Sequence, residues 1–151
     1  MHHKKLIFFL ANFSLGGAGE AIKKLSIDLK IKGFQLKIIC LGKCAYEKEL
    51  KKNGIEIKEL NFNNTLNSMP EIKKICKYES KLYDTIFFSN INYANALSLL
   101  FLRSINNLKI VLFERTPYEE LNFHFNSFSS YIKNKIIKLL IKFLYKKADL
   151  V

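Results

Sequence analysis

The stretch LIFFLANFSLGGAGEAIKKLSIDLK, residues 6–30, decides the fold. It begins with an unbroken apolar run over residues 6–11, which is typical of a parallel strand covered by helices on both faces. A glycine-rich turn follows over residues 14–20. Beyond it, apolar residues recur at spacings of four, three and four, which is one face of a helix, at Ala18, Ile22, Leu25 and Leu29. The stretch therefore predicts a strand, a glycine turn and a helix, in which backbone N–H groups at a helix start meet an anion.

The glycines of this turn suit contact with a ligand for two reasons. Glycine adopts positive φ, and it places no Cβ between a ligand and the backbone. We expect a phosphate or a sugar to contact the turn, and valine at position 17 to obstruct that contact and to resist a positive φ. The expected contact residues are Gly16, Gly17, Ala18, Gly19 and Glu20. The alternative is that the glycines only form a tight strand-to-helix turn.

Two well-known phosphate-binding turns do not fit this spacing. No Gly-x-x-x-x-Gly-Lys-Ser/Thr string is present, which excludes a Walker A loop. A dinucleotide fingerprint starting at Gly17 and Gly19 would need a third glycine where Ile22 stands, and the second predicted strand ends without an acidic residue. The sequence therefore argues against a nicotinamide or flavin cofactor.

The rest of the chain repeats the strand and helix pattern. Further strands are predicted over residues 35–41, 55–60, 85–88 and 108–113, and the alternating pattern of the second of these suits a sheet edge. Helices are predicted over residues 46–52, from Ser68 and Pro70 onward, and over residues 93–105 and 128–147. This order predicts an α/β fold, a doubly wound and mostly parallel sheet with helices on both faces.

Six short motifs occur in a recognisable order. They are the glycine turn at 16–20, Lys-Gly-Phe at 32–34, Leu-Lys-Lys-Asn-Gly-Ile at 50–55, Asp-Thr-Ile at 84–86, Glu-Arg-Thr-Pro at 114–117 and the closing residues 145–151. In this order the chain resembles the N-terminal, acceptor-side domain of family 4 retaining glycosyltransferases, which have two Rossmann-like domains. The closing residues resemble the entry to that domain's last strand, and the resemblance covers essentially the whole chain.

The resemblance implies transfer of a sugar from a nucleotide sugar to a glycan or lipid-linked acceptor, without a metal ion. It also implies that residues 1–151 form one domain and that most of the donor site lies in a second, C-terminal domain. We therefore expect the chain to be a fragment, a truncated frame or one subunit of a split enzyme, inactive alone. Two alternatives are a non-catalytic subunit that docks a partner and a membrane, and an unrelated α/β nucleotide-binding protein.

Polar residues after the fourth and fifth strands complete the predicted site, because parallel sheets bind ligands at the carboxyl ends of their strands. The resemblance implies a sugar-contacting polar residue after strand four, where Asn90 and Asn92 stand. Asparagine orients hydroxyls but transfers protons poorly, so no catalytic residue is assigned. Glu114 and Arg115 follow strand five, and the arginine suits bidentate phosphate binding. The alternatives are helix capping by the asparagines and a salt bridge of Arg115 to a nearby glutamate.

The net charge of +12 comes mostly from lysine and is spread along the chain, which argues against nucleic acid as the partner. In the last predicted helix, Lys135, Lys138, Lys142 and Lys146 form a stripe beside a wide apolar face. Such a face suits either packing on the sheet or an anionic membrane surface, and we favour the former for the apolar part.

The three cysteines, Cys40, Cys44 and Cys76, lack the spacing of a metal site. No secretory signal fits the N-terminus, and no apolar run reaches the roughly 18 residues that span a bilayer. We therefore expect a cytoplasmic protein with reduced cysteines, and the alternative is a peripheral position at the inner face of the cell membrane.

Overall fold

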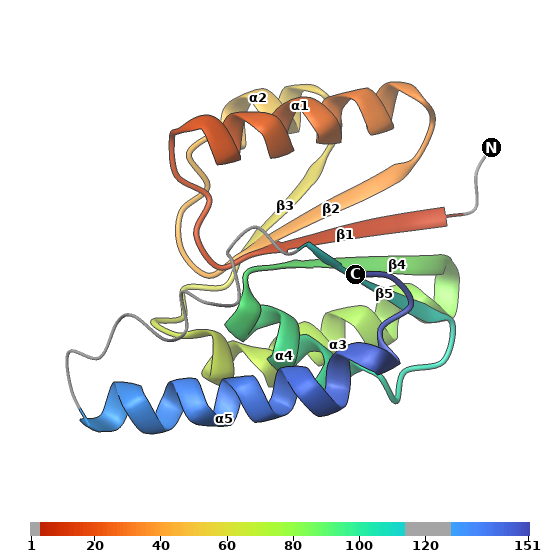
Figure 1. Ribbon diagram of the computed structural model, residues 1–151. Helices are drawn as coiled ribbons and strands as arrows, with labels where there is room; N and C mark the ends of the chain where they lie inside the picture. Colours follow the sequence, from red (N-terminus) through yellow and green to blue (C-terminus); the bar gives the residue numbers. More distant parts are fainter. Residues whose placement is uncertain (1–3, 114–127) are drawn as a thin grey trace.

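The computed structural model describes residues 4–113 and 128–151. Its centre is a sheet of five parallel strands in the order β3-β2-β1-β4-β5, with helices on both faces (Figure 1). The predicted α/β class is therefore confirmed, and so is the edge position of the third strand. The elements are β1 (Lys4–Leu10), α1 (Gly17–Ile31), β2 (Gln35–Cys40), α2 (Glu47–Lys52), β3 (Glu56–Glu59), α3 (Thr65–Leu82), β4 (Asp84–Asn90), α4 (Asn92–Leu102), β5 (Leu108–Phe113), α5 (Phe128–Leu144) and the short 3-10 helix η2 (Tyr145–Lys147).

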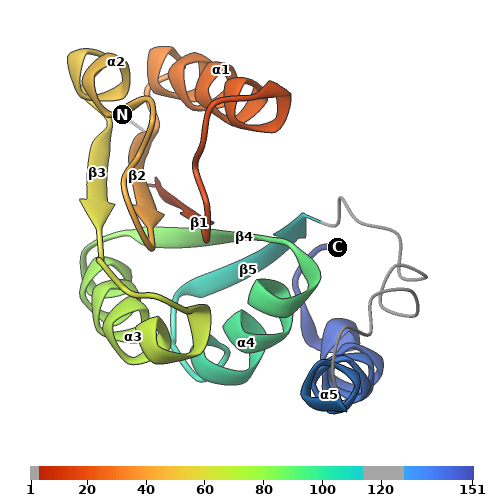
Figure 2. The ribbon, with the colours of Figure 1, turned by 90° about the vertical axis from the view of Figure 1, so that its left-hand side faces the viewer.

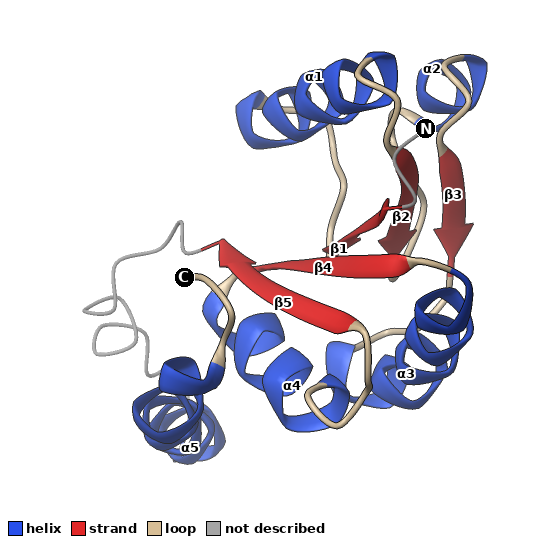
Figure 3. Ribbon diagram, turned by 90° about the vertical axis from the view of Figure 1, so that its right-hand side faces the viewer, coloured by secondary structure: helices blue, strands red, loops and turns tan. Residues whose placement is uncertain are grey.

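The central strand β1 is buried on both sides, which explains its unbroken apolar sequence. Leu6, Phe8 and Leu10 belong to the core under α1 and α2, whereas Ile7 and Phe9 belong to the core over α3 and α4. Figures 2 and 3 show α1 and α2 on one side of the sheet, over β1 to β3, and α3, α4 and α5 on the other. Alternate side chains of one strand therefore hold two helical layers on one sheet.

The order of the strands creates a switch point between β1 and β4. The chain steps outward from β1 through β2 to β3, returns along α3, and lays β4 on the free side of β1. The loops that follow β1 and β4 consequently leave toward opposite faces of the sheet (Figure 2). In open parallel sheets the crevice between two such loops is the usual place for a ligand.

Residues 148–151 return to the sheet beside β5. Val111 and Leu150 form a parallel bridge, and the amide of Leu112 donates to the carbonyl of Leu150 at 2.9 Å. The Asp149 carboxylate accepts from the amide of Ile110 at 2.7 Å. The expected entry to a sixth strand is thus present as a single bridge.

The start of α3 differs from the prediction. The helix begins at Thr65 instead of near Ser68, because Asn64 is its N-cap and accepts from the amide of Asn67 at 2.9 Å. Pro70 therefore lies inside the helix. The polar run before it contains several residues able to cap, so sequence alone did not select among them.

The buried face of α1 is also rotated from the prediction. Ile22 and Ser26 are its buried residues, whereas Leu25 is 38% exposed and Ala18 is exposed. The hydroxyl of Ser26 donates to the carbonyl of Ile22 at 2.8 Å, so its polar group is satisfied in the core. A small residue with an internal partner therefore replaces a leucine at the helix–sheet contact.

Four charged side chains form a cluster on the α3 side of the sheet, near the amino ends of the strands. Lys5 contacts Glu56 at 2.8 Å and Glu79 at 3.8 Å, while Lys37 contacts Glu56 at 3.1 Å and also pairs with Glu79. Lys5 and Glu79 are each only 3% exposed. Burial opposes ionisation of Glu56, but hydrogen bonds from Lys5 and Lys37 outweigh it and leave the pKa of Glu56 below its ordinary value.

Candidate functional site

The glycine turn leaves the start of α1 open. Gly16 is the N-cap and has no side chain, and among the described residues α1 receives no side-chain capping bond. The first helical bond runs from the amide of Glu20 to the carbonyl of Gly16, at 2.9 Å. The first-turn N–H groups that precede Glu20 have no acceptor within the helix. Since Gly17 and Ala18 are exposed, their N–H groups are available to an anion or a hydroxyl oxygen.

The three glycines of the turn have different structural requirements. Gly16 has φ +141°, whereas Gly17 has no positive φ, so the expectation of strain at position 17 is wrong and applies to Gly16 instead. A Cβ on Gly19 would lie 2.4 Å from the carbonyl oxygen of Ser14 and 3.0 Å from the ring of Tyr46. A Cβ on Gly17 would meet no atom within 4 Å. Close packing therefore requires a glycine at position 19. No contact among the described residues requires a glycine at position 17.

Tyr46 supports this turn from the neighbouring loop, and the sequence analysis did not identify it. Its hydroxyl accepts from the amide of Gly16 at 3.4 Å, and its ring lies 5.2 Å from that of Phe13. A hollow of about 470 Å³ opens beside the turn, lined by Leu15, Cys44 and Tyr46 among others. The position of Tyr46 in the sequence could have indicated this role, because Tyr46 follows β2, the strand next to β1.

Glu20 is held as a carboxylate by its neighbours. Lys23 lies 2.8 Å from Glu20 and 3.0 Å from Glu49, and its ammonium stands over the ring of Tyr46 at 5.2 Å. The hydrogen bond from Lys23 lowers the pKa of Glu20 below its ordinary value. Glu20 therefore offers acceptor oxygens to a ligand and does not suit proton donation at neutral pH.

Asn90 is the last residue of β4, so it lies at the carboxyl end of the sheet, as the glycine turn does. Strand alternation places it on the face of Phe88, toward α1, while Ser89 faces α4. Its Oδ1 atom is buried, and no hydrogen-bond partner for it is present among the described residues. Buried polar atoms are normally satisfied, so this oxygen is a candidate acceptor for a ligand donor.

The alternative in which the asparagines cap the fourth helix is not what the structure shows. Ile91, with φ 80°, is the N-cap of α4, and no capping bond from a side chain is present. Asn92 is buried within the first turn of α4, and its contact with a sugar stays a prediction. Asn95, which the sequence analysis did not single out, donates to the carbonyl of Phe113 at 3.2 Å and ties α4 to the end of β5.

Three phenylalanine rings, here called the aromatic floor, lie on the same side of the sheet as the side chain of Asn90. The rings of Phe8 and Phe88 stack with centroids 4.6 Å apart, and those of Phe88 and Phe113 are 5.4 Å apart. These side chains lie on the α1 side of three adjacent strands, and Phe88 and Phe113 are only partly buried. Among the described elements, α1 and α2 lie over β1 to β3 and leave β4 and β5 without a helix on this side (Figure 2).

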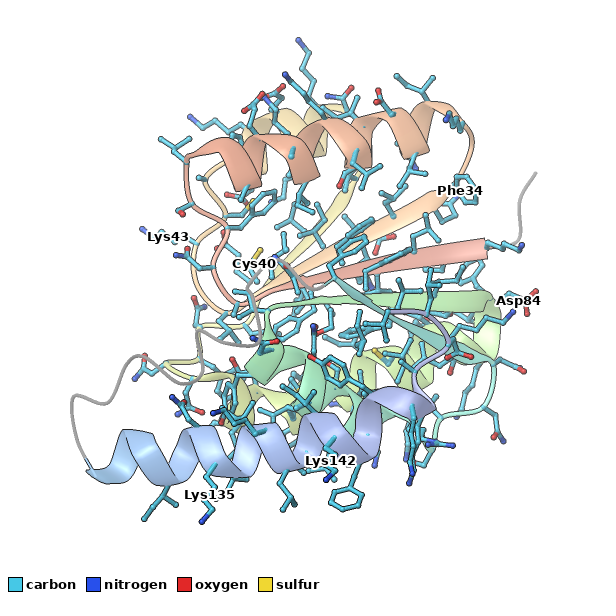
Figure 4. All side chains as sticks on the ribbon, in the orientation of Figure 1. Phe34, Cys40, Lys43, Asp84, Lys135 and Lys142 are labelled. Atoms are coloured by element: carbon cyan, nitrogen blue, oxygen red, sulfur yellow. The ribbon has the colours of Figure 1, made fainter. Side chains whose placement is uncertain are left out.

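The structure thus brings together part of the predicted site. The parallel pairing of β1 with β4 places the turn at Gly16–Glu20 and the side chain of Asn90 at one edge, across the switch point. Glu114 and Arg115 lie outside the described residues. Burial raises the pKa of Cys40, which lies at this end of β2 (Figure 4), and all three cysteines are buried and free.

No protein-family model and no curated protein matches this sequence. Residues 4–113 and 128–151 contain no group of three or more histidine, cysteine or acidic side chains placed to hold a metal ion. In the same residues, no helix has the length and apolar character needed to cross a bilayer.

Proposed function

We propose that this chain is the acceptor-side domain of a retaining glycosyltransferase. In this role it positions a hydroxyl of a glycan or lipid-linked acceptor against a nucleotide sugar. A second domain holds most of that nucleotide sugar, and the turn at Gly16–Glu20 contacts its phosphate or sugar oxygens. The observation that supports the proposal most is the edge at the switch point. There the uncapped start of α1 and the unpartnered oxygen of Asn90 border an aromatic floor.

Each part of this edge has a defined task in the proposal. The N–H groups of Gly17 and Ala18 donate to phosphate or sugar oxygens at the positive end of α1. Asn90 accepts from a sugar hydroxyl, and the partly buried rings of Phe88 and Phe113 pack against the apolar face of a sugar. Catalysis then rests on positioning and on stabilisation of the leaving diphosphate, without a metal ion. No described residue is assigned as a proton-transfer group.

The six glycines of the chain provide a direct test. Labelling only glycine with ¹⁵N gives a spectrum in which Gly17 and Gly19 report on the turn, while Gly33 and Gly54 report on loops before β2 and β3 at the opposite edge. UDP-glucose and GDP-mannose are the probes, and ATP is the comparison. We expect one of the nucleotide sugars to shift Gly17 and Gly19 and to leave Gly33 and Gly54 unchanged.

Two results would overturn the proposal. Equal or larger shifts with ATP would favour the unrelated nucleotide-binding protein, and shifts confined to Gly33 or Gly54 would move the site to the other edge. A transfer assay supplies the second arm. We expect no transfer by the chain alone, and transfer when it is mixed with a separate nucleotide-sugar-binding domain that completes it.

A further inference from the structure

The helix α5 has an apolar face on each side. Its inner side packs against α4 through residues such as Ile137, which is buried. Figures 2 and 3 show α5 at the outer corner of its layer, beside α4 and away from the sheet. Its outer side carries four large apolar residues that are 43%, 54%, 58% and 53% exposed, namely Ile132, Ile136, Leu139 and Phe143.

These four residues form one continuous stripe. Their spacings of four, three and four place them on one face of the helix, over roughly 16 Å of its length. A helix that only covers a sheet normally carries polar residues on its outer face. A stripe of this kind therefore indicates a surface that is covered when the protein acts.

The charges around the stripe define what covers it. The sequence of α5, FSSYIKNKIIKLLIKFL, contains no aspartate or glutamate. Lys135 and Lys142 are exposed on this helix (Figure 4), and Lys146 and Lys147 of η2 extend the basic region. The ion pairs between described residues lie elsewhere in the molecule, on β1, β2, β3 and α1 to α3.

We propose that the outer face of α5 lies in the interface of an anionic lipid bilayer. The stripe enters the boundary between headgroups and acyl chains, and the lysines extend their ammonium groups to the lipid phosphates. A second copy of the chain is a poorer occupant, because pairing two α5 helices would oppose lysines with no acid between them. The proposal concerns a different face from the carboxyl edge and does not depend on glycosyl transfer.

The chain contains no tryptophan, so one introduced tryptophan reports on the stripe alone. Leu139→Trp places it in the stripe, and Leu82→Trp places the control at the end of α3, where the leucine is similarly exposed at 56%. The full chain is mixed with vesicles of phosphatidylglycerol and phosphatidylcholine. We expect a blue shift and quenching by brominated acyl chains for Leu139→Trp, and neither for Leu82→Trp. Equal responses of the two variants would overturn the proposal.

A lysine pair tests the electrostatic part. Lys135→Gln with Lys142→Gln should weaken partitioning on the order of 25-fold, since each surface lysine contributes about fivefold. The control is the double variant Lys48→Gln with Lys52→Gln, whose lysines are exposed on α2, on the other side of the sheet. This variant should leave partitioning into the vesicles unchanged. Two outcomes overturn the proposal: absence of vesicle binding, or a blue shift that grows with protein concentration without lipid. The second outcome would assign the stripe to a second copy of the chain.

Discussion

The two ends of the sheet treat polar groups in opposite ways. At the amino end, Lys5 and Glu79 are buried, Lys37 is partly buried and Glu56 is exposed, and each of the four contacts partners of opposite charge. At the carboxyl end, the first turn of α1 lacks a capping side chain, and the Oδ1 atom of Asn90 has no described partner. The same fold therefore satisfies its charges where the chain only has to be stable, and leaves hydrogen-bonding capacity where a ligand is expected.

The difference has an energetic meaning. A buried ion pair contributes little compared with a well-packed apolar replacement, yet it is costly to break, because the remaining charge stays buried. A buried acceptor without a partner, such as Oδ1 of Asn90, already carries a desolvation cost in the free protein, and a ligand that supplies a donor recovers it. Substitutions at the two ends should therefore separate stability from binding.

The largest effect is expected from Glu79→Ala in the amino-end cluster. It removes a carboxylate that contacts both lysines and leaves Lys5 buried with Glu56 alone. We expect the free energy of unfolding to fall by about 3–5 kcal/mol, measured by urea denaturation. Lys77→Ala, exposed on the same helix, is the control and should change it by less than about 0.5 kcal/mol. Similar losses of unfolding free energy for both variants would show that the ion pairs of Glu79 do not make its removal more costly than that of an exposed side chain.

The next effect distinguishes two glycines of the carboxyl end. Gly19→Val forces a side chain against the Ser14 carbonyl and the Tyr46 ring, so we expect a loss of about 1–3 kcal/mol in thermal or urea denaturation. Gly17→Val meets open space and should cost less than about 1 kcal/mol, while weakening nucleotide-sugar binding by obstructing the backbone. If the valine at 17 unfolds the protein and its folded fraction binds normally, the turn is purely structural.

A smaller effect, of opposite sign, is expected at Asn90. Because its buried oxygen has no described partner, Asn90→Ala should range from no change to a gain of about 1 kcal/mol in the free energy of unfolding. Binding of the sugar ligand should weaken in a titration followed by the glycine signals. A clear loss of stability would mean that the protein itself satisfies this side chain, and would remove Asn90 from the site.

The smallest effect concerns how the free energy of unfolding changes at acid pH. The pKa of Glu56 is lowered in the folded protein, so its contribution is present above its ordinary value of 4.5 and is lost as the pH falls through the lowered folded value. In Glu56→Gln this contribution is absent. We expect the difference in unfolding free energy between the original protein and this variant to shrink below that pH. A difference that stays constant through the acid range would contradict the lowered pKa.

The strands could be predicted closely because they are short apolar runs between clear turns. The prediction for residues 108–113 matches β5, and those for the other four strands differ only at their ends. The face of α1 could not be predicted in this way. Hydrophobicity favoured Leu25, whereas the hydroxyl of Ser26 bonds to the helix's own backbone and thereby enters the core.

The site shows the same division. The glycine turn was visible in the sequence, because glycine spacing is a local property. The separate requirements of Gly17 and Gly19 were not, because they depend on how closely Ser14 and Tyr46 approach. Tyr46 and Asn95 reach the site through the pairing of strands, and a sequence does not state which side chains of neighbouring loops meet.

By itself, the sequence determined the alternation of strands and helices, and with it the parallel sheet, because hydrophobic periodicity and turn residues act over a few positions. It also determined the lysine stripe of α5 and the glycine turn. Only the tertiary structure decided which polar groups are paired. It placed Lys5, Lys37, Glu56 and Glu79 together from four separate elements, and left Asn90 without a described partner. The physical reason is that burial and partnership are properties of the packed chain, since they depend on segments far apart in sequence.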